Sequence, residues 1–372
     1  MKTAPRALTC ALVSVVVLSC QHPNPQLGGT LDAAAYSIFV SGSSVYVAGQ
    51  YWDGNAWSSC YWQNGIMVPT DGTVALAIYV DSGIVYTSGI TSAGGAFWTG
   101  TVRTDLPAAG SSRAETIWVT PGGSNVYTGG SWYSGSHWQA CLWNGTDRTD
   151  LPVSVGVTDS LIHSFSYTPT GAYFAGQRLD SAGWISCYWN WSGLTPQTDL
   201  PGGVGSSYSI FDSGGTIYNA GEFYNGKAWI PTLWTGTTPA TLPAFGAYGK
   251  YSASANGVWV NAGTTYVGGD YYDGANWNPC TWTNGSGPVT LPGASSDSLV
   301  NSVYFDGTTL YAAGYYWDGA EYVACYWQGS TKIDLRGMGK AQGINSAAQG
   351  RSAPAVGEFL STKGIPGRSW RP

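Results

Sequence analysis

The hydrophobic and polar pattern of the chain is clearest in a unit that begins at residue 36. Four short apolar and aromatic runs follow one another there, reading YSIFVSG, SVYVAGQYW, NAWSSCYW and IMVPT. Turn residues separate them, among them Asp53-Gly54 and Asn64-Gly65. Runs rich in Val, Ile, Tyr and Trp between such turns are typical of β strands, and Asp-Gly and Asn-Gly pairs favour type I′ hairpins. The unit therefore predicts four short antiparallel strands, and no long segment shows the apolar period of a helix.

The same unit recurs along the chain at intervals of 40 to 48 residues. The glycine at position 49 has equivalents at Gly89, Gly130, Gly176, Gly221, Gly269, Gly314 and Gly357. A tyrosine precedes most of these reference glycines by three positions, a tryptophan follows most of them by thirteen, and most units end in Leu-Pro. Periods of this length indicate solenoids, propellers or arrays.

Four antiparallel strands in such a unit correspond to one blade of a β-propeller. The pattern VYVAG, an aromatic residue, Asp-Gly and Trp resembles the repeats of kelch-like and secreted bacterial β-propellers. The resemblance covers nearly the whole mature chain, and its weight comes from the repetition. It implies an all-β fold in which residues 29–372 form a single β-propeller of eight repeats of about 44 residues.

The eighth copy, residues 344–370, is degenerate. It keeps Gly357 and Trp370 but has Pro354 where the other units have tyrosine, and it stops before a fourth strand. Residues 28–33 resemble the end of a unit and could supply that strand, which would close the ring and remove exposed sheet edges. Eight blades completed by an N-terminal strand are the preferred interpretation. Seven blades with residues 338–372 outside the ring are the alternative.

The first twenty residues have the form of an export signal. Two basic residues precede an apolar run from Ala7 to Leu18, which is too short to span a membrane. The ending Val-Leu-Ser-Cys resembles the lipobox of bacterial lipoproteins. We expect residues 1–19 to be a lipoprotein signal peptide, Cys20 to carry the lipid and residues 20–28 to form a tether. The resemblance implies a protein attached to the bacterial envelope by that lipid alone, at the outer membrane or cell surface if the cell has two membranes.

The composition excludes one class of partner. Charged residues make up only 10% of the chain and the formal net charge is −6, without any basic patch. Binding to nucleic acid needs a basic surface, so no nucleic-acid partner is expected. The high aromatic content of 14% argues against disorder in spite of the low charge.

Two sets of reactive side chains occupy repeated positions. Five cysteines lie eleven residues after a reference glycine: Cys60, Cys141, Cys187, Cys280 and Cys325. Equivalent points of neighbouring blades are about 10 Å apart, too far for a disulfide, so these should be free buried thiols. Asp53, Asp273 and Asp318 precede turn glycines where another unit has Asn225, so we expect them to form turns.

Catalytic and metal-binding patterns are missing from the sequence. The histidines His22, His137 and His163 form no motif, and we expect structural roles for the last two. No catalytic residue, metal site or cofactor is predicted.

Aromatic residues beside the turns between the second and third strands are the remaining candidates for ligand binding. They are Trp52, Tyr133, Tyr224, Tyr272 and Trp317. They could contact a glycan or a protein, or pack against their own surroundings. The sequence predicts a monomeric binding or scaffold module for protein partners without catalysis. The alternatives are a lectin-like carbohydrate-binding propeller and a glycan hydrolase or lyase.

Overall fold

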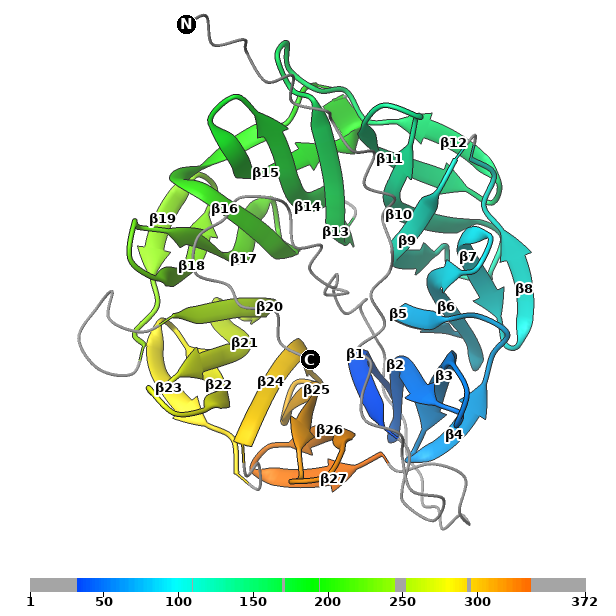
Figure 1. Cartoon of the computed structure of the whole chain (residues 1–372), viewed down its shortest axis with the longest axis vertical. Coiled ribbons are helices and arrows are strands. Elements are labelled where there is room, and N and C mark those ends of the chain that lie inside the picture. Colours follow the sequence, from blue (N-terminus) through cyan, green and yellow to red (C-terminus); the bar gives the residue numbers. More distant parts are fainter. Residues whose placement is uncertain are drawn as a thin grey trace, which may run out of the picture.

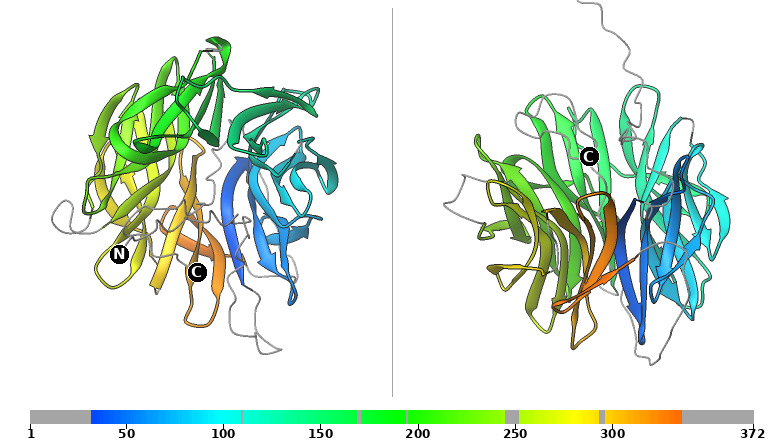
Figure 2. Two further views of the ribbon diagram at one scale, coloured as in Figure 1. Left: turned by 45° about the horizontal axis from the view of Figure 1, so that its top comes forward. Right: turned by 60° about the horizontal axis from the view of Figure 1, so that its bottom comes forward.

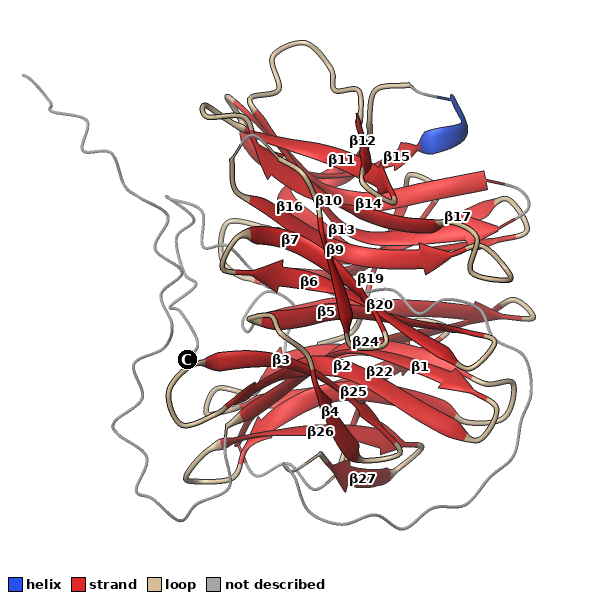
Figure 3. Ribbon diagram, turned by 90° about the vertical axis from the view of Figure 1, so that its right-hand side faces the viewer, coloured by secondary structure: helices blue, strands red, loops and turns tan. Residues whose placement is uncertain are grey.

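The computed structural model describes residues 32–335 except for 109, 169–170, 194, 245–251 and 293–295. Strands make up most of this part (Figure 3), and its one helix is the single 3₁₀ turn η1 (Trp191–Gly193). The sheets stand around a central axis, with strands such as β1, β9 and β20 innermost and strands such as β4, β12 and β23 at the rim (Figure 1). The β-propeller is therefore confirmed. No helix in the described residues has the length and apolar character needed to cross a membrane.

Each blade is built from consecutive antiparallel strands. The first three blades comprise β1 (Ala33–Ser41), β2 (Ser44–Trp52), β3 (Trp57–Gln63), β4 (Ile66–Pro69), β5 (Val74–Asp81), β6 (Ile84–Thr91), β7 (Gly94–Thr99), β8 (Val102–Asp105), β9 (Ser112–Val119), β10 (Val126–Tyr133), β11 (Trp138–Asn144) and β12 (Asp147–Asp150). The last two comprise β20 (Ala253–Asn261), β21 (Thr264–Tyr272), β22 (Trp277–Thr283), β23 (Ser286–Thr290), β24 (Ser296–Phe305), β25 (Leu310–Trp317), β26 (Tyr322–Gln328) and β27 (Thr331–Asp334).

Blades 4 and 5 share one long strand. They comprise β13 (Asp159–Thr168), β14 (Gly171–Asp180), β15 (Gly183–Asn190), β16 (Thr198–Ser213), β17 (Thr216–Tyr224), β18 (Trp229–Thr235) and β19 (Thr238–Thr241). The first part of β16, through Val204, pairs with β15, and the part from Gly205 pairs with β17. One strand thus serves as the outer strand of blade 4 and the inner strand of blade 5, and the described residues form seven blades.

The ring closes by direct contact of blade 7 with blade 1 (Figure 2). The backbone N–H of Tyr322 donates to Asp32 Oδ1 at 2.6 Å, and Asn301 Nδ2 donates to the Ala35 carbonyl at 2.8 Å. The contact between Trp138 N and Asp159 Oδ1 joins blades 3 and 4 in the same way. Because this junction has the geometry of an ordinary blade junction, the count in the described residues is corrected from the preferred eight to the alternative of seven. Ala33 lies in β1 and pairs inside blade 1, while residues 28–31 and the eighth copy lie outside the described residues.

The contact between neighbouring blades explains why Trp and Leu-Pro recur at the same spacing in the units of this chain. In five blades the indole Nε1–H donates to the carbonyl of the Pro that ends the preceding blade, as in Trp189 to Pro152 at 2.9 Å. Trp98 donates instead to Asp71 Oδ1, because blade 1 does not end in Leu-Pro. Trp62 Nε1 has no hydrogen-bond partner among the described residues, and the position equivalent to the Pro is 336, outside them.

Each of the seven blades has a β-bulge in its inner strand, and this bulge explains the reference glycine on the next strand. The bulge brings a carbonyl of the inner strand against this glycine, so that a Cβ on Gly89 would lie 1.9 Å from the Val74 oxygen. The corresponding distance is between 1.9 and 2.1 Å at all seven reference glycines in the described residues. A side chain cannot be accommodated there, which explains why the glycine recurs in each unit.

Candidate functional site at the propeller axis

The bulges place one unpaired residue of each inner strand around the axis. These seven bulge residues are Tyr36, Leu76, Glu115, His163, Tyr208, Asn256 and Asn301. All of them are buried. Bulges often redirect a side chain at a functional site. Since the repeat fixes the backbone but leaves this residue variable, the ring of bulge residues can differ in chemistry from blade to blade.

The bulge residues of blades 1 and 2 are apolar or aromatic, whereas blade 7 supplies Asn301. Tyr36 and Leu76 pack in one cluster with Ala34 and Val74, and Ile90 and Tyr315 lie against it. This group, which we call the apolar arc, comes from blades 7, 1 and 2. It contains no charged side chain.

Blades 3 to 6 supply the opposite, polar side. Its members are Arg113, Glu115, His163, Gln177, Tyr208, Glu222, Asn256 and Asp270, and we call them the polar arc. Arg113 Nε pairs with Glu115 Oε1 at 2.6 Å. Farther round, the ring of His163 lies 5.9 Å from that of Tyr208, whose hydroxyl donates to Glu222 Oε1 at 2.8 Å.

The members of the polar arc in blade 6 are hydrogen-bonded to each other. Asn256 Nδ2 donates to Asp270 Oδ1 at 3.0 Å, and Ser254 Oγ donates to Asn256 Oδ1 at 2.7 Å. Between blades 4 and 5, the Ser206 hydroxyl donates to the side-chain oxygen of Gln177. Of these hydrogen bonds, the one between Ser206 and Gln177 joins blade 4 to blade 5, and the other two lie within blade 6.

One buried polar atom of the arc is left unpaired. Glu115 Oε2 has no hydrogen-bond partner among the described residues, whereas the side chain of Gln177 lies within reach of the His163 ring. Burial and, to a smaller extent, the positive charge of Arg113 lower the pKa of His163 from 6.5 to about 3, against the opposing effect of a hydrogen bond with Gln177. His163 is therefore neutral at physiological pH. Unpaired buried polar groups are rare in folded proteins and each needs an explanation.

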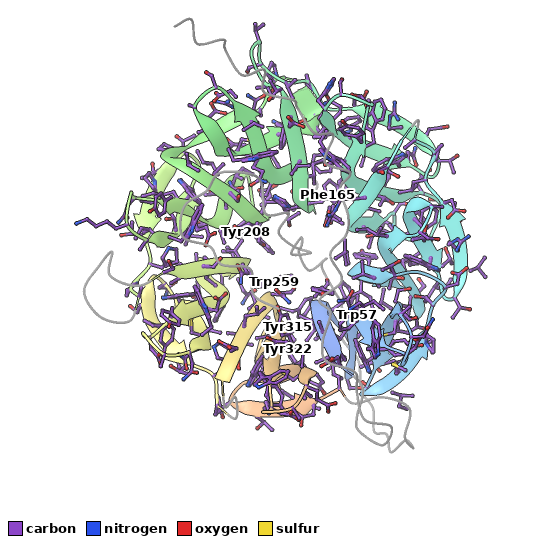
Figure 4. All side chains as sticks on the ribbon, viewed as in Figure 1. Trp57, Phe165, Tyr208, Trp259, Tyr315 and Tyr322 are labelled. Carbon is purple, nitrogen blue, oxygen red and sulfur yellow. The ribbon has the colours of Figure 1, made fainter. Side chains whose placement is uncertain are left out.

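An aromatic layer lies beyond the bulges on the inner strands. Phe211, Trp259, Tyr304, Phe39 and Tyr79 are in successive ring contact, with centroids 4.4 to 5.6 Å apart. Phe165 and Trp118 contact each other on the remaining side. Figure 4 shows Phe165, Tyr208 and Trp259 on the inner strands around the axis. Phe39 follows Tyr36 by three residues, which places the aromatic layer about 10 Å farther along the axis, away from the face that carries the turns between second and third strands.

The five aromatic residues predicted to bind a ligand pair with a neighbour on their own hairpin. Each lies opposite the aromatic residue that begins the third strand: Trp52 with Trp57, Tyr133 with Trp138, Tyr224 with Trp229, Tyr272 with Trp277 and Trp317 with Tyr322. Their ring centroids are 5.0 to 5.8 Å apart, and all five predicted residues are half-buried. The structure thus gives them a packing partner, and their contact with a ligand stays a prediction.

Asp53, Asp273 and Asp318 form turns as predicted, but these turns do not have the predicted type I′ geometry. Asp53 Oδ1 accepts from the backbone N–H groups of Asn55 and Ala56, each at 2.8 Å, and Asp273 and Asp318 do the same. These backbone hydrogen bonds lower the pKa of Asp53. Type I′ geometry occurs at Asn64-Gly65, with φ of 52° and 80°, but Asp53 itself has no positive φ. The Asp-Gly turns are longer loops because the carboxylate replaces a backbone acceptor.

The five repeated cysteines are free and buried, as predicted. Burial raises the pKa of each thiol well above 9. Cys20 lies outside the described residues. Thiols of this kind are inert packing groups.

At an exposed turn in the described part of the chain, two serine hydroxyls lie close to one histidine ring. Ser134 and Ser136 lie 3.1 and 2.9 Å from His137 Nδ1, while Ser134 Oγ accepts from His137 N. Ser134 therefore accepts a backbone hydrogen bond in the turn of blade 3, as Asp53 does in the turn of blade 1.

No group of three His, Cys, Asp or Glu side chains among the described residues forms a possible metal site.

Sequence reasoning missed the polar arc. It assigned His163 a structural role and did not consider Glu115, Tyr208 or Glu222. A usable indication was present, since the bulge lies at a nearly constant offset before the reference glycine and the residues at that offset change from apolar to polar between units. Recognising it required the position of the bulge.

The chain is similar in fold to parts of several solved hydrolases, among them one β-propeller domain. A puromycin hydrolase gives a TM-score of 0.57 at 11% identity, over 85% of this chain and 55% of that one. A Mycobacterium tuberculosis puromycin-hydrolyzing peptidase gives 0.55 at 10% identity, over 81% and 53%. The β-propeller domain of the Trilobed protease from Pyrococcus furiosus, described as having an open velcro topology, gives 0.50 at 8% identity, over 83% and 97%. No protein-family model and no curated protein matches the chain.

These matches correct the functional prediction. The expected binding or scaffold module for protein partners, without catalysis, does not agree with matches to peptide- and puromycin-hydrolysing enzymes. The chain spans about half the length of the two puromycin-hydrolysing proteins, and at these identities the likeness shows the fold alone. The resemblance to kelch-like repeats in particular stays a prediction.

Proposed function

We propose that this protein takes part in the hydrolysis of peptides or peptide-like molecules, and that it holds the substrate at the polar arc. The fold similarity to puromycin-hydrolysing peptidases motivates the reaction class. The observation that carries the site is the buried oxygen Glu115 Oε2, which has no hydrogen-bond partner among the described residues.

A peptide supplies the groups that the polar arc lacks. Its amide N–H groups and its amino end are donors, which Glu115 Oε2 can accept. The carbonyl oxygens can accept from Arg113 or from the imidazole N–H. A ligand that satisfies Glu115 Oε2 removes a desolvation penalty of about 1–3 kcal/mol.

Binding and turnover are measured together on the purified protein. Puromycin and a panel of di- and tripeptides are titrated by calorimetry, and the same mixtures are followed by mass spectrometry for cleavage products. We expect at least one compound to bind, and Glu115→Gln to weaken it by about tenfold or more through loss of a charged hydrogen bond. The matched control is Asp105→Asn on the outer strand β8, where the side chain is 55% exposed.

The proposal fails if no compound binds at millimolar concentration. It also fails if Glu115→Gln and Asp105→Asn bind the same compound equally well. Should Glu115→Gln not fold, a photoreactive form of the bound compound replaces it: labelling of β9, β13 and β16 is expected, and labelling confined to outer strands would place the site elsewhere.

We further propose export and lipid attachment at Cys20 as the location of this activity. The support is the sequence alone: a basic start, an apolar run from Ala7 to Leu18 and the following cysteine. Mass spectrometry of the protein from a bacterial host should find Cys20 as a lipid-modified first residue. An unprocessed amino terminus, or cleavage elsewhere without lipid, contradicts this location.

A further inference from the structure

The formal charge is divided unevenly between the propeller and the C-terminal part of the chain. Among the described residues, aspartate and glutamate occur at twenty positions and lysine and arginine at six, a formal sum of −14. Residues 336–372, which we call the tail, lie outside the described residues and contain six basic residues and one acidic residue, a formal sum of +5. The basic residues are Arg336, Lys340, Arg351, Lys363, Arg368 and Arg371. A charged segment of this kind is typical of a tail that makes electrostatic contacts.

Blades 6, 7 and 1 carry five carboxylates on one face of the propeller. Asp273, Asp318 and Asp53 are exposed in the turns between the second and third strands of these blades. Asp297 and Asp32 belong to the same face, because each accepts from the backbone N–H that begins the third strand of the preceding blade. We call these five carboxylates the acidic face.

Basic residues are rare in the same three blades. In their described residues the one lysine or arginine is Lys332, which lies on the outer strand β27 and pairs with Asp334 at 3.3 Å. Blade 2 differs, because Arg103 pairs at 3.1 Å with Asp71 in the connection that leads into it. The acidic face therefore lies in the part of the propeller that has the fewest positive charges of its own.

The turns of the acidic face do not need their charge to form. In blade 5 the side-chain oxygen of Asn225 accepts from the backbone N–H groups of Lys227 and Ala228, each at 2.9 Å. Asp53 makes the same pair of hydrogen bonds in blade 1. Carboxylates at these turns thus add a negative charge that the local fold does not require.

The tail begins beside the acidic face. Leu335 is buried at the end of blade 7, and its N–H donates to the Ala324 carbonyl at 2.8 Å, two residues from the Tyr322 N–H that binds Asp32. At five other junctions the residue after this leucine accepts from the Trp indole of the next blade.

The indole at the junction of blades 7 and 1 indicates the path of the tail. It belongs to Trp62, which is only 1% exposed and whose Nε1 has no partner among the described residues. The residue that follows Leu335 is Arg336, the first of the tail. A buried donor without a partner is rare, and a carbonyl at position 336 would satisfy this one as proline does elsewhere in the ring.

We infer that the tail lies on the acidic face of its own propeller. The Arg336 carbonyl accepts from Trp62 Nε1, and the basic side chains of the tail stand beside Asp32, Asp53 and Asp318. An extended chain covers about 3.3 Å per residue, so a segment that begins at this junction reaches the turns of all three blades. Single exposed ion pairs contribute little, but several of them together hold a segment in place. The inference goes beyond the proposed function and does not depend on it, because the polar arc lies on the inner strands.

Limited digestion of the full chain by trypsin tests this contact, because trypsin cuts after lysine and arginine. The face variant removes three charges and keeps hydrogen bonds that asparagine also makes: it carries Asp53→Asn, Asp273→Asn and Asp318→Asn. The control variant removes three charges at turns of the opposite face: it carries Asp81→Asn, Asp147→Asn and Asp306→Asn. We expect the tail of the face variant to be cut about tenfold faster than in the unmodified protein, and the control to match the unmodified protein, because cleavage follows the population of the released tail.

Crosslinking gives the position of the tail and needs no substitution, so it decides the question if the face variant does not fold. A carbodiimide joins lysine amines to nearby carboxylates, and we expect Lys340 or Lys363 to be joined to carboxylates of the acidic face. Equal cleavage rates of the face and control variants overturn the inference, as do tail crosslinks confined to the opposite face. In a mixture of isotopically light and heavy protein, crosslinks within one copy support the inference, and crosslinks only between copies overturn it in favour of the tail of a second molecule. Failure of the peptide panel would overturn the proposed function and leave these results unchanged.

Discussion

Replacing one reference glycine by alanine tests whether the nearby carbonyl of the bulge is what requires glycine at this position. At Gly89 an added Cβ would lie 1.9 Å from the carbonyl oxygen of Val74 and 2.9 Å from its carbonyl carbon. Real Cβ contacts stay beyond 3.0 Å, so strands β5 and β6 would have to separate by about 1 Å at the bulge. Gly89 belongs to blade 2, which contributes to the apolar arc only, so the polar arc is not altered directly.

The magnitude follows from the rigidity of the two paired strands. Overpacking typically costs about 1–3 kcal/mol, and a backbone atom that cannot turn aside belongs at the upper end, near 3 kcal/mol. With an unfolding entropy of about 2.1 cal/mol/K per residue over roughly 300 residues, this corresponds to a fall in melting temperature of about 5 °C.

Thermal unfolding by circular dichroism measures the change, with Gly193→Ala as the control. The nearest atoms to a Cβ on Gly193 belong to the side chain of Thr195 at 3.6 Å, so we expect a change within about 0.5 kcal/mol. If Gly89→Ala melts within about 1 °C of Gly193→Ala, the close carbonyl is not what requires the glycine, and the reasoning is refuted.

Three further predictions concern groups inside the ring. Trp189→Phe loses the hydrogen bond to the Pro152 carbonyl, whereas the Nε1 of Trp62 has no partner among the described residues. Trp189→Phe should therefore lower the free energy of unfolding by about 1–2 kcal/mol more than Trp62→Phe does, and equal losses in denaturant titrations would contradict this. Because the pKa of His163 is near 3 in the folded state and near 6.5 in the unfolded state, only the unfolded state binds this proton as the pH falls below 6.5. The free energy of unfolding should therefore decline by up to about 1.4 kcal/mol per pH unit toward pH 5, and the decline should be shallower in His163→Gln. Equal slopes in the two proteins would show that His163 is not buried as neutral imidazole. The cysteines at positions 60, 141, 187, 280 and 325 should resist alkylation in the folded protein and react in denaturant; rapid labelling of any of them, mapped by mass spectrometry, would mean that its blade junction opens.

The repeat was readable from the sequence because its backbone requirements are strict. The bulge carbonyl requires glycine, the junction between blades requires an indole donor and a carbonyl acceptor, and the turns require Asn, Asp or Gly. Each of these requirements leaves the same residue type at the same offset. Strand order, blade composition and the free cysteines could be predicted for this reason.

The number of blades and the candidate site could not be predicted in this way. A degenerate copy such as residues 344–370 looks like a blade in sequence, but closure depends on whether blade 7 fits blade 1, which is decided by contacts such as that of Tyr322 with Asp32. Four residues of the polar arc depart from the repeat at the bulge, namely Glu115, His163, Tyr208 and Asn256, and Gln177, Glu222 and Asp270 do so at the position after the reference glycine. A repeat pattern contains only the positions that stay constant, so Glu115, Tyr208 and Glu222 are not part of it.

Closure without an exchanged strand has a consequence for the order of assembly. The contact of Tyr322 with Asp32 joins residues 290 positions apart, whereas its counterpart between Trp138 and Asp159 spans 21. By the logarithmic dependence of loop entropy on length, bringing the two ends together costs about 2 kcal/mol more than forming an internal junction. The six internal junctions can thus form early and one after another, while the seam, which is the junction of blade 7 with blade 1, forms last. It is also the place where the finished ring would first come apart.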